Sequence, residues 1–139
     1  MGSFEVKDSG ARQSFDTGAV RDTNEGKGCF DLISPIFLKR LACQLQAGAA
    51  KYSSRNWEAG MPVTRCFDSA VRHLYTHLEG ERSEDHLAAA AFNFMAIIHG
   101  EEMVKRGKLP HELVDWPNYL DTCPTPDTCQ EKGCRGFCE

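Results

Sequence analysis

The sequence lacks the features of a membrane-spanning, nucleic-acid-binding or secreted protein. Its longest almost apolar run, Leu87 to Ile98, has 12 residues and is interrupted by Asn93, too short for a bilayer-spanning helix. The 16 basic residues are outnumbered by 20 acidic ones, so no basic surface for a nucleic-acid duplex is expected. The first ten residues, MGSFEVKDSG, contain no apolar signal-peptide core. We therefore expect a cytoplasmic globular protein without nucleic-acid or membrane partners.

Segments that alternate apolar and polar residues, as half-buried strands do, are also missing, whereas three segments carry apolar residues at helical spacing. Ser34 and Pro35 predict the start of the first helix, Thr64 that of the second and Ser83 that of the third. The pattern predicts an all-α fold, a bundle of about three long helices. Its parts are an extended or looped N-terminal arm (1–34), a helical core (35–107) and a Cys-rich tail (108–139).

The third predicted helix is apolar on nearly all of its faces. A helix of this kind must be covered on every side, and two partner helices from one small chain do not suffice. The sequence therefore predicts self-association as a homodimer or homotetramer.

Ionisable residues gather where the second and third helices meet. They are His73, His77, Glu81, Glu84, Asp85 and His86. Carboxylates on adjacent helices of a bundle bind divalent cations, which makes Glu81, Glu84, Asp85 and His86 candidate metal ligands. The same pattern also fits a solvated turn whose acids cap the third helix.

The segment KYSSRNW (51–57) combines cations, an amide and aromatic rings. Lys51, Arg55 and Asn56 suit phosphate binding, and Tyr52 and Trp57 suit stacking on a base. The alternative is a helix end with an aromatic residue that anchors the following loop. Upstream, Lys27 lies between two glycines and can approach a phosphate closely, although the GxxxxGK[ST] spacing of a phosphate loop is missing.

Four cysteines crowd the tail with the spacing C-x5-C-x4-C-x3-C: Cys123, Cys129, Cys134 and Cys138. In a reducing compartment four thiolates form a complete tetrahedral set for one structural Zn²⁺. The alternative is a flexible tail of free thiols.

Four stretches taken together resemble the phage-type dATP/dGTP diphosphohydrolases, which are MazG-like all-α nucleoside triphosphate pyrophosphohydrolases. They are GAVRDTNEGKGCFDLISP, AGAAKYSSRNWEAGMP, SAVRHL and EGERSEDHLAAAAFNFMAIIHGEEM. The resemblance implies an oligomeric helical bundle that hydrolyses a deoxynucleoside triphosphate, dGTP in the first place, to the monophosphate and pyrophosphate. It further implies two or three Mg²⁺ or Mn²⁺ ions, and a role in adjusting a phage nucleotide pool in the infected host cell, for 2-aminoadenine DNA synthesis.

The resemblance also suggests residue roles. It implies catalytic roles for Glu81, Asp85 and Lys51. It implies substrate contacts for Lys27, Asp31, Tyr52, Arg55, Asn56, Trp57, His73 and Asn93. The ExxE and ExxD metal motifs of the wider superfamily have no clean match here, since their places fall near residues 72–76 and 86–89. A different class of function stays open beside the enzyme: a non-catalytic helical interaction module that works through a zinc-binding tail.

Overall fold

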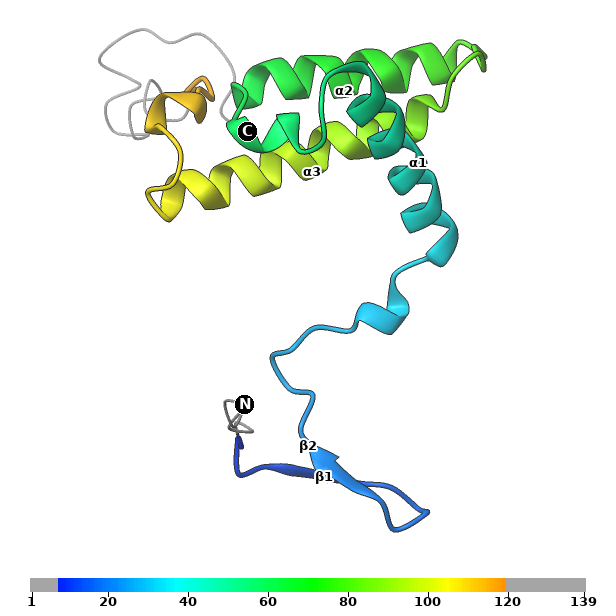
Figure 1. Ribbon diagram of the computed structural model, residues 1–139, viewed down its shortest axis with the longest axis vertical. Helices are drawn as coiled ribbons and strands as arrows, with labels where there is room; N and C mark the ends of the chain where they lie inside the picture. The colour runs from blue at the N-terminus through cyan, green and yellow to red at the C-terminus, as the bar shows by residue number, and fades with distance from the viewer. Residues whose placement is uncertain (1–7, 120–139) are drawn as a thin grey trace, which may run out of the picture. The chain divides into compact units, whose positions relative to one another are not determined.

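The computed structural model describes residues 8–119 and divides the chain into two compact units, Met1–Leu38 and Lys39–Glu139. Helices dominate the described residues, as the sequence predicts (Figure 1). Three α-helices, α1 (Pro35–Lys51), α2 (Val63–Leu78) and α3 (His86–Lys105), lie at the predicted places within residues 8–119. In that part of the chain, no helix combines the length and apolar character that a bilayer crossing requires.

The first unit contains a short β-hairpin. β1 (Arg12–Ser14) pairs antiparallel with β2 (Val20–Asp22), and Arg12 lies opposite Asp22. The sequence predicts an extended or looped arm here, and the hairpin was not predicted. All of β1 and most of β2 are exposed, so neither strand has the apolar and polar alternation that reveals a half-buried strand. The 3₁₀ helix η1 (Phe30–Leu32) follows before α1 begins.

The predicted start of the first helix is confirmed, because Ser34 Oγ accepts a hydrogen bond from the backbone N–H of Phe37 at 3.3 Å. The other two starts are wrong by two residues. α2 begins after Pro62 rather than after Thr64, and the N-cap of α3 is Asp85 rather than Ser83. The Asp85 side chain accepts from Ala88 N at 3.1 Å.

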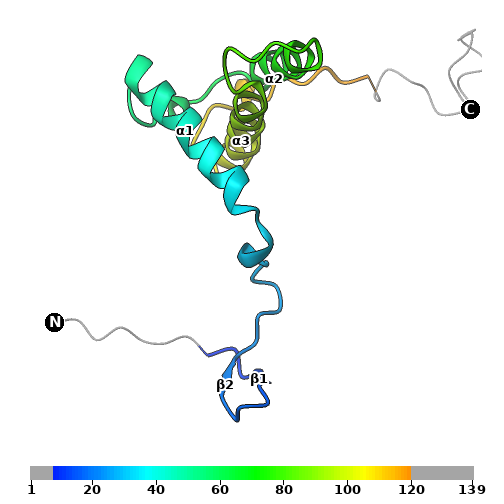
Figure 2. The same ribbon diagram turned by 90° about the vertical axis from the view of Figure 1, so that its right-hand side faces the viewer.

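The core of the second unit lies between α2 and α3, which run side by side (Figures 1 and 2). α2 contributes buried Val63, Cys66 and Ala70. α3 contributes Ala88, Ala89, Ala90, Ala96 and Ile97. Alanine at the contact allows the two helix backbones to approach closely, so a small core suffices to pair them. α1 by contrast has no buried residue.

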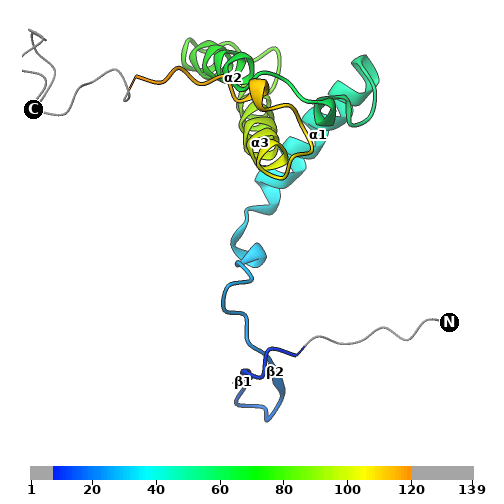
Figure 3. The same cartoon turned by 90° about the vertical axis from the view of Figure 1, so that its left-hand side faces the viewer.

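The chain returns after α3 to the start of α2 (Figure 3), passing through the 3₁₀ helix η3 (His111–Leu113). The side chains of Leu109 and Leu113 lie against Gly60, which follows the 3₁₀ helix η2 (Asn56–Ala59). A Cβ on Gly60 would lie 2.7 Å from Leu113 Cδ1, and its φ is +96°, so this contact requires glycine. The first residues of the segment assigned to the tail by composition therefore pack on the helical unit.

Candidate functional site

The turn between α2 and α3, residues 79–85, is held by hydrogen bonds to the last turn of α2. Glu81 N donates to Thr76 O at 3.2 Å. Arg82 Nη1 donates to the carbonyl oxygens of His77 at 2.7 Å and Glu81 at 2.6 Å. The acidic side chains of this turn therefore have defined positions beside the ends of both helices.

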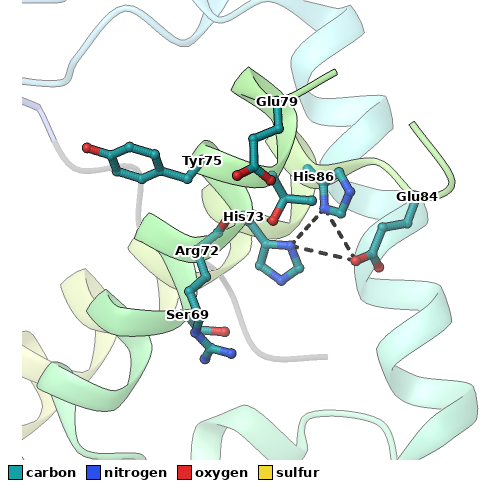
Figure 4. Close-up of a pocket in the computed structure, with 8 residues that line it drawn as sticks. Ser69, Arg72, His73, Tyr75, Glu79, Glu84 and His86 are labelled. Carbon is teal, nitrogen blue, oxygen red and sulfur yellow. Dashed lines mark hydrogen bonds and ion pairs between the residues drawn. The ribbon is translucent and has the colours of Figure 1, made fainter. Parts of the chain in front are cut away.

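His73 from α2, Glu84 from the turn and His86 from the start of α3 converge (Figure 4), and we name them the His–Glu–His cluster. The two Nδ1 atoms lie 3.1 Å apart. Glu84 Oε1 lies 3.7 Å from His73 Nδ1 and 3.3 Å from His86 Nδ1. His86 is 4% exposed and the Glu84 side chain 55%, so the cluster joins the buried helix contact to solvent.

Glu81 contacts the other nitrogen of the same ring. Its carboxylate pairs with His86 Nε2 and accepts the backbone N–H of Ser83. The His86 bond, helped by the Ser83 N–H, lowers the pKa of Glu81 to about 2. Glu81, predicted as a metal ligand, thus lies on the far side of His86 from His73 and Glu84.

Asp85, predicted as a ligand and as a catalytic residue, has partners on both oxygens. Arg40 donates from Nε to Oδ2 at 2.7 Å and from Nη2 to Oδ1 at 2.6 Å. Arg40 is the main reason that the pKa of Asp85 falls to about 2. Sequence reasoning missed Arg40, because a pair 45 residues apart along the chain leaves no local signal.

The donor chemistry of the site can be compared with the predicted ligand set. Of the four predicted ligands, Glu84 and His86 lie together, and His73, predicted to contact substrate, completes their group. Magnesium binds through oxygen in octahedral geometry, and this group offers a single carboxylate. Two imidazole nitrogens and one carboxylate oxygen instead fit a divalent cation that accepts nitrogen ligands.

Two hollows of about 380 and 370 Å³ share Glu84 and His86 as part of their walls. The first hollow extends along α2 past Arg72 and Tyr75 (Figure 4). The second is lined by Arg40, His77 and Arg82. Arginine therefore lies on each side of the His–Glu–His cluster, beside the carboxylates of Glu79 in the first hollow and Asp85 in the second, and can offer N–H donors to an anionic ligand.

The segment 51–57 lines neither hollow. Trp57 is half-buried, and its ring meets that of His99 edge-on at 4.8 Å between centroids, which matches the anchoring alternative. Tyr52 is 67% exposed, and Lys51 Nζ lies 5.2 Å from its ring centroid. Arg55 Nη1 pairs with Glu58 at 2.5 Å, and Asn56 begins η2.

The remaining predicted contacts have the following surroundings. Lys27 and Asp31 belong to the first unit, where Lys27 Nζ lies 2.8 Å from Asp22 Oδ2 and Asp31 lies within η1. Asn93 is buried in α3, and its Nδ2 donates to Ala89 O at 2.9 Å. The four cysteines predicted to bind zinc lie outside the described residues.

Comparison with protein families decides between the enzyme and the interaction module. Residues 17–111, well over half of the chain, match the family model described as dATP/dGTP diphosphohydrolase, N-terminal. The chain belongs to this family. It is therefore a nucleoside triphosphate pyrophosphohydrolase, and the resemblance read from its motifs is confirmed. A search of curated proteins and one of solved structures find no match.

The matched region of this dATP/dGTP diphosphohydrolase includes the whole His–Glu–His cluster and both arginines of the second hollow. Arg82 was not among the predicted residues, although it stands within the acidic turn. His77 is four residues from His73, and that spacing predicts a shared helix face.

Proposed function

We propose that this diphosphohydrolase cleaves dGTP to dGMP and pyrophosphate and that it needs a divalent metal ion. The observation that carries the proposal is the His–Glu–His cluster between two hollows whose walls contain arginine. Membership of the dATP/dGTP diphosphohydrolase family supplies the reaction class. In this reaction a water oxygen bonds to the α-phosphorus, and pyrophosphate leaves from the opposite side.

The second hollow is the proposed place of the triphosphate. Arginine binds phosphate oxygens through two parallel N–H groups, and Arg40 and Arg82 offer such groups beside Glu84. Arg40 is engaged by Asp85 in the structure, so a phosphate would share or replace that carboxylate. Lys51 and Arg55 are the further cations of the second unit that the sequence analysis assigned to phosphate.

His73, Glu84 and His86 would hold the ion. When bound, a divalent ion neutralises phosphate charge and lowers the pKa of a coordinated water. The residues of the chain have separate tasks: the arginines orient the phosphates, and Glu81 holds the ring of His86. The burial of His86 keeps bulk water away from one side of the cluster.

Base recognition is proposed for the 51–57 segment. Tyr52 is the better stacking residue, because its ring is 67% exposed whereas that of Trp57 contacts His99. The Asn56 amide carries both donors and an acceptor, as the guanine edge with its O6, N1–H and N2–H requires. Asn93 suits this task less, since its Nδ2 already donates to Ala89 within α3.

Self-association as a homodimer or homotetramer is part of the proposal. Leu74 and Leu78 on α2, and Phe94 and Ile98 on α3, are exposed apolar residues of the second unit. Exposed large apolar side chains on a small protein favour contact with another copy. In a phage-infected cell, the reaction would remove dGTP and supply dGMP, the direction that 2-aminoadenine DNA synthesis needs.

The test is turnover of each nucleoside triphosphate by the full chain with Mg²⁺, Mn²⁺ and Zn²⁺ in turn, with products separated by anion-exchange chromatography. We expect equal amounts of dGMP and pyrophosphate. Glu84→Gln should lower turnover about 100-fold or more, because a metal site contributes several kcal/mol and each 1.36 kcal/mol is about tenfold in rate. Glu102→Gln, which removes a carboxylate paired with Arg106, is the matched control and should be unchanged. Release of inorganic phosphate alone would refute the reaction class, and equal rates on pyrimidine nucleotides would refute the proposed base selection.

A further inference from the structure

We infer that the His–Glu–His cluster binds one ion of the zinc class in preference to magnesium, and that Glu81 acts as the positioning residue for His86. The inference deepens the proposed function, since it names the ion and the support of its site. Only the effect of the ion on a nucleotide depends on the proposed function. Binding itself can be measured without one.

The three donor atoms are close enough together to bind one zinc-class ion. His73 Nδ1, His86 Nδ1 and Glu84 Oε1 form a triangle with sides of 3.1, 3.3 and 3.7 Å. A point about 2 Å from all three corners exists, and this is the usual bond length from zinc to nitrogen or oxygen. Donors of a tetrahedral zinc site lie about 3.3 Å apart, whereas adjacent donors of an octahedral magnesium site lie about 2.9 Å apart.

The donor types agree with this spacing. Imidazole nitrogen suits zinc, cobalt, nickel and iron, whereas magnesium selects oxygen. Two histidines and one carboxylate leave an open coordination position, the arrangement of catalytic rather than structural zinc sites. The open position would take water or a phosphate oxygen.

The hydrogen bonds of His86 place an electron pair in the cluster. If Nε2 donates its hydrogen to Glu81, the neutral ring has its free electron pair on Nδ1, a tautomer assigned from the partners. Nδ1 then lies 3.3 Å from the Glu84 carboxylate, so two electron-rich atoms lie close together. A metal ion between the two atoms makes this arrangement favourable, and its competitor for the Nδ1 electron pair is a hydrogen donated by His73 Nδ1 at 3.1 Å.

Glu81 is built to hold this ring. Its Oε2 pairs with His86 Nε2, and its Oε1 accepts the Ser83 N–H at 2.5 Å, so both oxygens are engaged. A carboxylate that accepts from the outer nitrogen of a metal-binding histidine fixes the ring and makes its inner nitrogen a better donor. Loss of such a carboxylate lowers metal affinity about 10–100-fold, whereas loss of a ligand abolishes the site.

The experiment titrates the metal-stripped full chain with Co²⁺, a spectroscopic substitute for zinc, without nucleotide. Visible absorption reports a tetrahedral ion. The same titration in a background with Cys123→Ser, Cys129→Ser, Cys134→Ser and Cys138→Ser removes any contribution of the tail thiolates. Nitrogen NMR of the histidine rings, recorded with diamagnetic Zn²⁺ in place of Co²⁺, reports whether His86 carries a metal on Nδ1.

We expect one Co²⁺ in the tail-free background, displaced by Zn²⁺ and not by a large excess of Mg²⁺. Glu84→Gln should remove the visible bands while the protein stays folded, because this side chain is mostly exposed. Glu81→Gln should keep the bands and weaken binding about 10–100-fold. Glu102→Gln is the control for a lost carboxylate elsewhere and should bind as the wild type does.

Two results would overturn the inference. Equal Co²⁺ binding by wild type and Glu84→Gln would refute the site, and a His86 Nδ1 that carries no metal at saturating Zn²⁺ would refute it as well. Equal affinity of wild type and Glu81→Gln for Co²⁺ would refute the positioning role of Glu81 and would not affect the ion site. Co²⁺ binding as expected without hydrolysis of any nucleotide would refute the proposed function and leave the ion site, so the two failures are distinguishable.

Discussion

Asp85 makes two contacts that different substitutions can separate. It caps α3 through the Ala88 N–H, and it pairs with Arg40. Asp85→Asn keeps an oxygen that can cap the helix and removes the charge. Asp85→Ala removes both the cap and the pair. The difference between the two variants therefore measures the cap, and the effect of Asn alone measures the ion pair.

The magnitudes follow from exposure. The Arg40 and Asp85 side chains are 48% and 36% exposed, so their pair should contribute about 0.5 kcal/mol, within the range of surface ion pairs. A helix cap contributes about 1 kcal/mol. Asp85→Asn should lower the free energy of unfolding by about 0.5 kcal/mol and Asp85→Ala by about 1.5 kcal/mol.

The pH dependence gives a second readout with a defined sign. Arg40 lowers the pKa of Asp85 from its ordinary 3.8 to about 2 in the folded chain. The stability that the charged form contributes is therefore complete above the ordinary pKa and is lost as the pH falls through about 2. The gap between wild type and Asp85→Asn should be constant near neutral pH and should close on acidification.

Urea unfolding followed by far-UV circular dichroism, at neutral pH and at several acidic pH values, provides the assay. If Asp85→Asn and Asp85→Ala destabilise the protein equally, the side chain of residue 85 does not stabilise α3 as a cap. A loss of several kcal/mol from Asn would refute the treatment of the pair as solvent-screened. A fall in turnover of about 100-fold without a stability change would instead favour the catalytic role that the sequence analysis assigned to Asp85.

Four further predictions concern other parts of the molecule. Asp115→Ala should lower the urea midpoint at pH values above the ordinary pKa of 3.8 and should have no effect at pH values well below it. The reason is that the charged Asp115 carboxylate accepts hydrogen bonds from Thr64 N and Oγ1, and the Thr64 hydroxyl is the main cause of its lowered pKa. Ala70→Leu should lower the free energy of unfolding by about 1–3 kcal/mol, since Ala70 is fully buried between α2 and α3; a cost near zero in urea unfolding would mean that the contact is loosely packed. Ile98→Lys should reduce the mass measured by light scattering without lowering helix content, because Ile98 is 69% exposed; an unchanged mass would place any self-contact elsewhere. Elemental analysis should find one zinc fewer per chain when the four tail cysteines become serine, and four freely titratable tail thiols in the wild type would contradict the predicted tail site.

Much of the helical fold could be predicted from local signals. Apolar spacing located all three α-helices, and Ser34 with Pro35 marked the start of α1. The start of α2 was misplaced because its first N–H groups are capped by Asp115, a residue 51 positions away. The hairpin of the first unit was missed because its exposed strands need no apolar pattern.

The residue types of the candidate site were also predictable, and their grouping was not. The sequence alone placed histidines and acids together at the junction of α2 and α3, since helix periodicity and a short turn bring them near one another. Which atom of each faces which partner depends on the packing of α2 against α3. That packing joins His73 to Glu84 and His86, leaves Glu81 behind the His86 ring and gives Asp85 to Arg40.

The sequence by itself determined the fold class and the reaction family, because both follow from short-range patterns: helical periodicity, caps and ordered motifs. The tertiary structure decided which of several equivalent acids can face a metal. Charges pair with the nearest opposite charge that the backbone allows, and the nearest partner of Asp85 comes from another helix. No one-dimensional pattern contains that distance, so the proposed ligand Glu84 and the proposed positioning residue Glu81 can be told apart only after α2 and α3 are packed together.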